Sequence, residues 1–306
     1  MRHFFVVVAL GAMAAACQSK APSSETKGQA PAPKSRDGAA LPTGRVEAST
    51  LAGDGMYLFW TEKGKVVRSD REGKGLALIA RDDGMKGMMA IDATHVYWTT
   101  DGGFARVSKQ GGSLEVVTRT MYQPGGIAAE NGRIYYTVPK EGKVMVGEKG
   151  GDPKEIAAGE KTPVEIAVDK DFVYWSTTDG SIRKRSLFGG QPETMATEQK
   201  DLAALCVDDK QLYWVRRRGG VASLPKGGGK PKTLVPSASD VTSCVSDGNY
   251  LYLAAARTVT RVPPAGGDPA EVVRTAGAIG KLVVDDKALY WNDYAGGKVM
   301  KVQKEL

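Results

Sequence analysis

The stretch "VYWTTDGG", residues 96–103, returns almost unchanged as "VYWSTTDGS" at residues 173–181. Both copies place two aromatic residues before small hydroxyl residues and an Asp-Gly turn. The pair recurs along the chain as Phe59-Trp60, Tyr97-Trp98, Tyr135-Tyr136, Tyr174-Trp175, Tyr213-Trp214, Tyr252-Leu253 and Tyr290-Trp291. Its second members are 38 or 39 residues apart. So regular a period indicates a repeated structural unit.

Other features keep the same register. An acid stands six residues before each second member of the pair: Asp54, Asp92, Glu130, Asp169, Asp208, Asp247 and Asp285. A polar turn follows the pair, and then come a basic alternating stretch, a Gly-rich turn and a last apolar run. Each unit therefore predicts four short antiparallel strands joined by tight turns, with no helical period.

Four strands in a period near 38 residues are typical of a β-propeller blade. Seven pairs predict an all-β, seven-bladed propeller over residues 38–306. The seventh unit supplies three strands before Leu306, whereas Ala39 to Thr43 has the layout of a fourth strand with no blade before it. We expect this N-terminal strand to complete the last blade and close the ring.

Residues 1–16 differ from the rest. A short cationic start precedes an apolar run from Phe4 to Ala16, which is too short to span a bilayer and is typical of a secretory signal. The run ends in "AAAC", which resembles the lipobox of bacterial lipoproteins, although Ala14 replaces the usual Leu. The resemblance implies that Cys17 is lipidated and anchors the protein to a membrane. An ordinary signal peptide with an incidental cysteine is the alternative.

Residues 17–37 carry this cysteine and a polar segment rich in Pro, Ser and Lys. Such a composition cannot bury enough apolar surface to fold, so we expect a flexible tether with a reach of about 25 Å. Gln18 stands where an Asp tends to keep lipoproteins of enteric bacteria in the inner membrane. We therefore expect a cell-envelope protein on the outer membrane, at its periplasmic face or surface.

Charge and histidine content exclude several function classes. The formal charge is +7, of which the propeller region carries about +4 without the clustering of a nucleic-acid-binding protein. Apart from His3 in the signal, His95 is the only histidine. One histidine excludes multi-His metal sites and weakens any Ser-His-Asp triad. We expect a monomer with no nucleic-acid partner, no metal and no cofactor.

The repeat resembles the YWTD repeat of LDL-receptor-type propellers. The residues that carry the resemblance are Phe59-Trp60-Thr61-Glu62, Tyr97-Trp98-Thr99, Tyr174-Trp175-Ser176 and Tyr290-Trp291-Asn292-Asp293. Those propellers have six blades of slightly longer repeats, and here Tyr136 and Leu253 replace Trp. The chain is also similar to bacterial NHL-like and streptogramin-lyase-like propellers, and the latter depend on a top-face histidine that this sequence lacks. The resemblance implies a fold rather than an activity.

The repeated residues are interpreted as scaffold. Each acid precedes a turn, where a carboxylate can bind the backbone two residues further on. The two aromatic residues should point to opposite faces of the blade and pack against the two neighbouring blades. A cation site formed by the seven acids is the less favoured alternative.

Cys206 and Cys244 lie on the predicted innermost strands of blades five and six. An exported protein could oxidise them to a disulfide. However, their positions in the repeat differ by one residue, which should point the side chains to different faces. We therefore favour two small buried hydrophobic residues, and a disulfide remains the alternative.

Positions that break the repeat are the candidate site. They lie on the top face, which consists of the second-to-third-strand turns and the links between blades. Blade five carries Arg216, Arg217 and Arg218 there, and the following units add Arg257, Arg274 and Lys281. Such a basic sector could hold a carboxylate, a phosphate or a sulfated sugar through forked hydrogen bonds, or it could be a solvated rim.

Blades two and four instead carry Asp101 and Asp179 in the equivalent turn. Tyr122, Asp293 and Tyr294 are further non-repeating candidates on the top face. Taken together, the sequence predicts a lipid-anchored module that binds or scaffolds a protein or an anionic envelope polymer. A propeller lyase or hydrolase with a top-face site, and a purely structural envelope component, are the alternatives.

Overall fold

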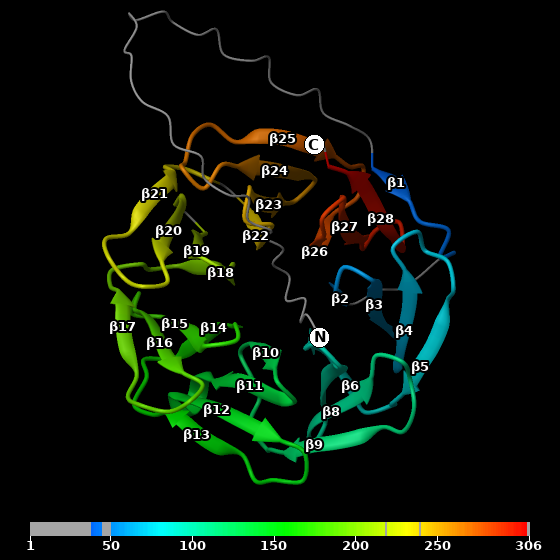
Figure 1. Ribbon diagram of the computed structural model, residues 1–306, viewed down its shortest axis with the longest axis horizontal. Helices are drawn as coiled ribbons and strands as arrows, with labels where there is room; N and C mark the ends of the chain where they lie inside the picture. Colours follow the sequence, from blue (N-terminus) through cyan, green and yellow to red (C-terminus); the bar gives the residue numbers. More distant parts are fainter. Residues whose placement is uncertain (1–37, 45–49, 218, 239, 305–306) are drawn as a thin grey trace, which may run out of the picture.

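The computed structural model describes residues 38–44, 50–217, 219–238 and 240–304. These residues form seven four-stranded antiparallel sheets, arranged as blades around a central axis (Figure 1). The prediction of an all-β, seven-bladed propeller is therefore confirmed. The predicted signal (1–16), the tether with Cys17 (17–37) and Arg218 lie outside the described residues.

Each blade begins with its innermost strand and proceeds outward. Blade 1 comprises β2 (Thr50–Gly53), β3 (Tyr57–Glu62), β4 (Lys65–Asp70) and β5 (Ala77–Arg81). Blade 2 comprises β6 (Met85–Ile91), β7 (His95–Thr100), β8 (Gly103–Ser108) and β9 (Glu115–Arg119). Blade 3 comprises β10 (Ile127–Glu130), β11 (Arg133–Val138), β12 (Lys143–Glu148) and β13 (Lys154–Ala157).

Blade 4 comprises β14 (Pro163–Val168), β15 (Phe172–Thr177), β16 (Ile182–Ser186) and β17 (Glu193–Ala196). Blade 5 comprises β18 (Leu202–Val207), β19 (Gln211–Arg216), β20 (Val221–Pro225) and β21 (Lys232–Val235). Blade 6 comprises β22 (Val241–Ser246), β23 (Leu251–Ala255), β24 (Thr258–Val262) and β25 (Ala270–Arg274).

Blade 7 is closed by the N-terminal strand, as predicted. It consists of β26 (Ile279–Val284), β27 (Ala288–Asp293), β28 (Lys298–Gln303) and β1 (Ala39–Ala40). Ala39 pairs with Lys301, and the Leu41 amide donates to the Val299 carbonyl over 2.8 Å. The β4–β5 turn of blade 1 then packs on Leu41 at Gly73, where a Cβ atom would lie 2.8 Å from the Leu41 Cβ. The N-terminal segment thus seals the border between the last blade and the first.

Helical structure within the described residues is confined to one 3₁₀ turn, η1 (Pro139–Glu141), in blade 3. No helix in the described part of the chain is long and apolar enough to cross a membrane.

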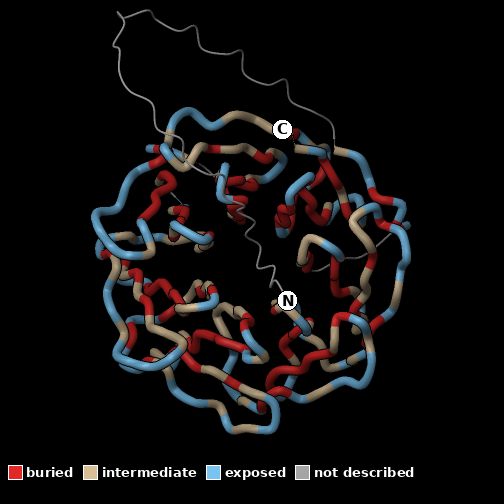
Figure 2. The backbone as a smooth tube through the Cα atoms, viewed as in Figure 1, coloured by how far each residue is buried: buried red, intermediate tan, exposed pale blue. Residues whose placement is uncertain are grey.

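The aromatic pairs form the borders between blades, as expected from strand alternation. At each border the first member of one pair packs with the second member of the next, for example Phe59 with Trp98 and Tyr174 with Trp214. Figure 2 shows that the buried residues lie inside the blades, whereas exposed residues follow the loops and the outer rim. The repeated phrase is therefore the core of the ring.

The repeated aspartates close the turns that follow the innermost strands. In six blades one carboxylate oxygen accepts the amides two and three residues further on, which confirms the turn-capping interpretation. In five of them the second oxygen also accepts the hydroxyl of the repeated Tyr, over 2.7–3.1 Å. This tyrosine bond joins the turn to the core and was not predicted.

Several of these repeated aspartates also form an ion pair with a cationic side chain of the following blade. It is the residue directly after the third strand, and it reaches back across the border to the acid of the preceding blade. We call this contact the inter-blade clasp. Four clasps are present: Lys109 with Asp54 (2.8 Å), Lys226 with Asp169 (2.5 Å), Arg71 with Asp285 (3.0 Å), and Lys304 with Asp247.

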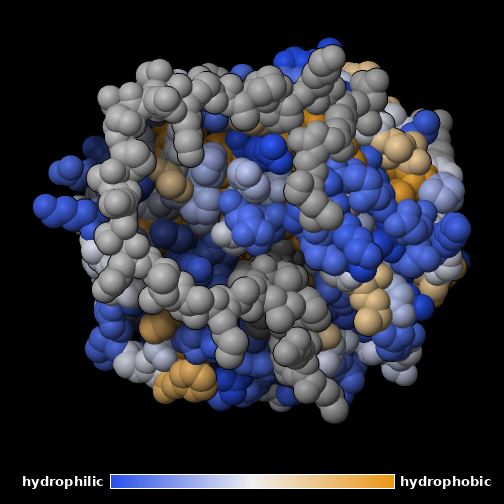
Figure 3. Space-filling view, turned by 45° about the horizontal axis from the view of Figure 1, so that its top comes forward, coloured by the Kyte–Doolittle hydropathy of each residue, from blue (hydrophilic) through white to orange (hydrophobic). Residues whose placement is uncertain are grey.

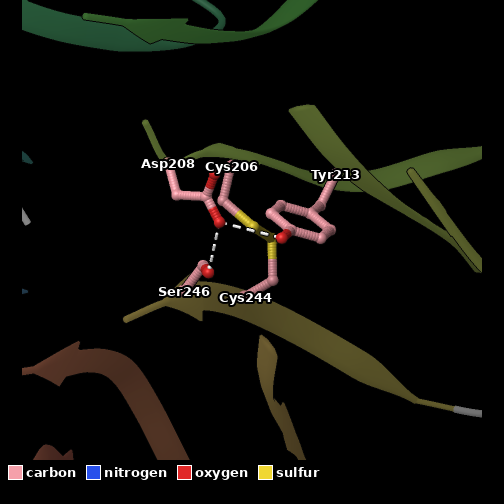
Figure 4. The surroundings of a disulfide bond; sticks show 5 residues. All are labelled: Cys206, Asp208, Tyr213, Cys244 and Ser246. Carbon is pink, nitrogen blue, oxygen red and sulfur yellow. Dashed lines mark hydrogen bonds between the residues drawn. A yellow bond between two sulfur atoms is a disulfide. The ribbon is translucent and has the colours of Figure 1, made fainter. Parts of the chain in front are cut away.

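Cys206 and Cys244 form a disulfide between blades 5 and 6, with their Cα atoms 6.1 Å apart (Figure 4). The preference for two unpaired buried thiols was therefore wrong. Equivalent positions point to the same side of every blade, so an offset of one residue turns one side chain back toward the blade before it. Cys206 pairs with Tyr213 and Cys244 pairs with Leu253, and both partners belong to the core of this border. The offset is thus the condition that lets the two sulfur atoms meet.

Candidate functional site

The top face is organised by irregularities at the ends of the innermost strands. Five of these strands carry a β-bulge in their pairing with the second strand. In blade 4 the bulged Glu165 amide donates to Ser176 Oγ over 3.2 Å, and in blade 7 the Lys281 amide donates to Asn292 Oδ1 over 2.8 Å. The residue after the aromatic pair therefore holds the bulge, and the bulge re-aims the side chain beside it.

The arginine turn of blade 5 is tied to the links on both sides of it. The Arg217 amide donates to the Asp201 carbonyl over 2.7 Å, and the Gly219 carbonyl accepts the Ala238 amide over 2.8 Å. Arg216 is half-buried, its Nε has no hydrogen-bond partner, and Gly219 packs so closely that a Cβ would lie 2.9 Å from that nitrogen. Arg217 is exposed. The backbone thus fixes this turn while leaving the Arg217 side chain available.

Glu165 is a site residue that the sequence analysis missed. Burial raises the pKa of this carboxyl, while the positive charges of Lys281 and Arg217 act in the opposite direction. Side chains from blades 4, 5 and 7 therefore share one electrostatic environment. The signal in the sequence was that this repeat position is uncharged in the other blades except for Lys281. A half-buried carboxyl near two cations can bind a proton or a cationic group, and the cations can bind an anion.

The remaining predicted arginines occupy the neighbouring blade. Arg257 is exposed in the β23–β24 turn, and its carbonyl accepts the Thr275 amide over 2.9 Å. Arg274 ends β25, and Thr258, which follows Arg257, pairs with it. The Arg274 guanidinium forms an ion pair with Glu271 of the same outer strand. The structure thus leaves Arg257 exposed and places Arg274 on the outer wall with its charge partly compensated.

Asp293 and Tyr294 lie together in the β27–β28 turn. Asp293 accepts the amides of Ala295 and Gly296, both over 3.0 Å, so its carboxylate stabilises the turn itself. Tyr294 is 55% exposed. Tyr122 is 40% exposed in the β9–β10 link, on blade 3 and away from the arginine turn.

The acids of blades 2 and 4 are engaged locally. Asp101 pairs with Lys86 over 2.7 Å. Asp179 accepts the Thr177 hydroxyl over 2.6 Å and the Ser181 amide over 3.1 Å, and these bonds lower its pKa. The carboxylates of Asp101 and Asp179 are therefore bound by neighbouring groups of their own blades.

His95 is the first residue of β7, at the end of the blade opposite the top face. Its Nδ1 is 2.7 Å from Thr94 Oγ1, and burial together with the charge of Arg106 lowers its pKa. The His95 imidazole is therefore bonded to a neighbouring hydroxyl, and its lowered pKa favours the neutral form. Among the described residues, no group of three or more His, Cys, Asp or Glu side chains is arranged to bind a metal ion.

In the view of Figure 3, hydrophilic residues cover most of the visible described surface, and hydrophobic residues appear as separate patches.

Known proteins share this architecture at low sequence identity. No family model and no curated protein matches the chain. Streptogramin B lyase is 13% identical with a TM-score of 0.67, covering 88% of this chain and 97% of that chain. YCF48 bound to D1 peptide is 12% identical with a TM-score of 0.62, covering 88% and 96%. The nidogen/laminin complex contains a chain that is 20% identical with a TM-score of 0.56, covering 72% and 94%. At such identities the likeness establishes the propeller fold alone.

Proposed function

We propose that this chain is a binding or scaffold propeller that lipid on Cys17 holds at a membrane of the cell envelope, with the outer membrane favoured. Its partner is a protein or an anionic envelope polymer that contacts the top face. The observation that carries this proposal is a difference between repeated and non-repeating side chains. The repeated residues form the turn caps, the inter-blade clasps and the packed borders between blades. The non-repeating Arg217 and Arg257 are exposed on turns that backbone hydrogen bonds hold in place. A rigid scaffold with exposed charges suits recognition of a carboxylate, phosphate or sulfate group.

The likeness to other propellers supports a binding role in general terms. One similar structure is bound to a peptide and another belongs to a protein complex, although each describes only the protein that it names. The lipobox interpretation rests on the sequence of residues 14–17, and the YWTD-type likeness rests on the sequence of the repeat. Both are therefore part of the proposal.

The test is photo-crosslinking from the top face in intact cells. A photo-reactive residue placed at Arg217 or Arg257 is expected to capture a partner, identified by mass spectrometry. The same residue at Lys170, which is exposed in the opposite turn of blade 4, is the matched control. Equal capture from all three positions would refute a top-face site. Separately, Cys17→Ser is expected to release the protein from the membrane fraction, and persistent fractionation would refute the lipid anchor.

A propeller lyase or hydrolase is the second candidate, favoured by one observation. The raised pKa of Glu165, beside the charges of Lys281 and Arg217, is the kind of perturbation found at catalytic acids and bases. If the protein is an enzyme, Glu165→Gln should still capture the partner but leave it unmodified, whereas wild type should change its mass. An unchanged mass with both proteins would remove this candidate.

A further inference from the structure

Four exposed aliphatic side chains lie on the outer strands of two neighbouring blades. Leu76, directly before β5, and Leu78, within β5, are 50% and 47% exposed. Leu114, directly before β9, and Val116, within β9, are 41% and 50% exposed. The strand registers give Leu76 and Leu114 the same repeat position in blades 1 and 2, and they do the same for Leu78 and Val116. We call these four residues the apolar wall.

The apolar wall is not part of the repeat. The position of Leu76 is occupied in blades 3 to 6 by Pro153, Pro192, Pro231 and Pro269. The position of Leu78 is occupied there by Glu155, Thr194, Thr233 and Glu271. Proline and polar or charged residues suit an outer strand that meets water and must not pair with other chains. Blades 1 and 2 alone have replaced both with aliphatic residues, so something other than water is expected to meet them.

The apolar wall lies along two adjacent borders. Leu78 is directly opposite Val67, which packs between blades 7 and 1. Val116 is directly opposite Ala105, which packs between blades 1 and 2. Because directly paired residues share a face of the sheet, the exposed side chains follow these borders to the outer surface.

The N-terminal segment joins the domain beside this wall. Gly38 precedes β1, and the pairing of Ala39 with Lys301 gives it the same position in blade 7 that Leu76 has in blade 1. An ion pair of 2.5 Å between Glu72 and Lys301 fastens the two blades there. Figure 1 shows β1, β5 and β9 in succession along one side of the ring. The segment that begins at Cys17 therefore reaches the domain at the level of the apolar wall, one blade away.

Cations accompany the same two strands. Arg81 ends β5 and Arg119 ends β9, and both are exposed. The corresponding positions of blades 3, 4 and 5 are Ala158, Thr197 and Pro236, whereas in blade 6 the position holds Arg274, whose guanidinium pairs with Glu271. An arginine beside an aliphatic surface can keep its guanidinium at lipid phosphates while its stem lies on apolar atoms.

We propose that the apolar wall is the membrane-facing side of the propeller and rests on a phospholipid surface. This inference depends on the proposed lipid at Cys17, which would hold the wall near the bilayer. The ring axis then lies along the membrane plane. Blade 5, across the ring from blades 1 and 2 (Figure 1), then holds its arginine turn on the side of the ring far from the lipid, where a partner can reach it.

The first experiment uses the repeat as its own control. A photo-reactive amino acid is placed at Leu78 or Val116, and at the equivalent Thr194 or Thr233, in the full chain in cells. Lipid adducts are expected to be several-fold more abundant from the first two positions. Equal lipid adducts from all four, or protein adducts without lipid at Leu78 and Val116, would overturn the proposal. If the wild-type chain is absent from membranes, the anchor fails and this inference fails with it.

The second experiment separates the wall from the anchor. Lipidated protein in vesicles of phosphatidylethanolamine and phosphatidylglycerol is compared with the double variant Leu78→Ser/Val116→Ser and with Phe188→Ser. Phe188 is 84% exposed in blade 4, away from the wall. The double variant should stay on the vesicles but lose amide-exchange protection of β5 and β9 by about tenfold, because two aliphatic contacts with lipid are removed. Protection equal to that of Phe188→Ser would overturn the wall while leaving the anchor intact.

Discussion

Three of the seven borders between blades lack the inter-blade clasp, and two of them differ in what replaces it. In the alignment of the repeats, the clasp position is held by Lys149 in blade 3, which pairs with Glu115 instead, by Leu187 in blade 4 and by Pro264 in blade 6. Between blades 5 and 6, the Ser246 hydroxyl donates to Asp208 over 2.7 Å, and the disulfide joins the two innermost strands (Figure 4). Between blades 3 and 4, Leu187 packs into the apolar cluster, while the buried Glu130 keeps an oxygen without a hydrogen-bond partner.

The difference shows that a clasp can be replaced safely only when its acid finds another donor. Glu130 has also lost the capping role, because Asn131 and Gly132 have positive φ angles and form a tight turn without a side-chain cap. Burial, together with the charges of Asp92 and Asp169, raises the pKa of Glu130 to about 8. The carboxyl is therefore protonated at neutral pH, since ionisation would leave an uncompensated buried charge.

Removing the disulfide should have the largest effect. In a Cys17→Ser background, the double variant Cys206→Ser/Cys244→Ser releases a loop closed over a sequence separation of 38 residues. The loss of constraint on the unfolded chain corresponds to about 4 kcal/mol of unfolding free energy, measured by denaturant titration. The same titration of the parent protein with and without reductant is the control. Coinciding midpoints would show that the border between blades 5 and 6 does not need its covalent link.

Breaking a clasp should have the next largest effect. Lys226→Met leaves Asp169 buried with its cation gone, and we expect a loss of about 2 kcal/mol because the charge is only partly compensated by the remaining donors. Lys149→Met is the matched control, because Lys149 has the same repeat position but is exposed and pairs with Glu115 on the rim. Its loss should be below about 0.5 kcal/mol. Equal losses for the two variants would refute the clasp as a stabilising contact.

The contrast between the borders also marks what the sequence could reveal. The period of 38 or 39 residues predicted the blades, the aromatic borders between them and the closure of the ring by Ala39–Ala40. Each of these features depends on one repeat or on the register of the repeats. The clasp was hidden because the cation and its acid belong to different repeats, although each was visible as a recurring charge. The disulfide was misjudged because the offset between Cys206 and Cys244 was considered on one blade, whereas the bond spans two facing blades.

The candidate site was less predictable than the scaffold. Arg217 and Arg257 were found as interruptions of the repeat. Glu165 was missed because its environment depends on a bulge in β14 and on charges from blades 5 and 7. Neither the bulge nor the approach of distant blades leaves a local pattern in the sequence.

The pH dependence of stability gives a smaller, sharper test of the border between blades 3 and 4. The folded state holds the Glu130 proton up to about pH 8, whereas the unfolded chain releases it near the ordinary Glu pKa of 4.5. Stability contributed by this proton is therefore complete below pH 4.5 and is lost as the pH rises toward 8. Glu130→Gln should match wild type near pH 5 and be more stable by about 2 kcal/mol at pH 8. Parallel pH profiles of the two proteins would contradict the assigned pKa.

Restoring the missing cation should have the smallest effect, because a gain and a loss oppose each other. Leu187→Lys places an ammonium group where Lys109 and Lys226 form clasps, so it should pair with Glu130 and lower the pKa of that carboxyl. It also removes an aliphatic side chain from the cluster around Trp175. We expect a net gain of about 1 kcal/mol at pH 8, measured by denaturant titration, and a loss at pH 5.

The double variant Glu130→Gln/Leu187→Lys separates these two terms. With no carboxylate to bind, the lysine should only cost packing energy, so the double variant should be less stable than Glu130→Gln at both pH values. If Leu187→Lys also stabilises the Gln variant, the lysine does not act through an ion pair with Glu130. The border between blades 3 and 4 would then be an apolar alternative to the clasp rather than an incomplete one.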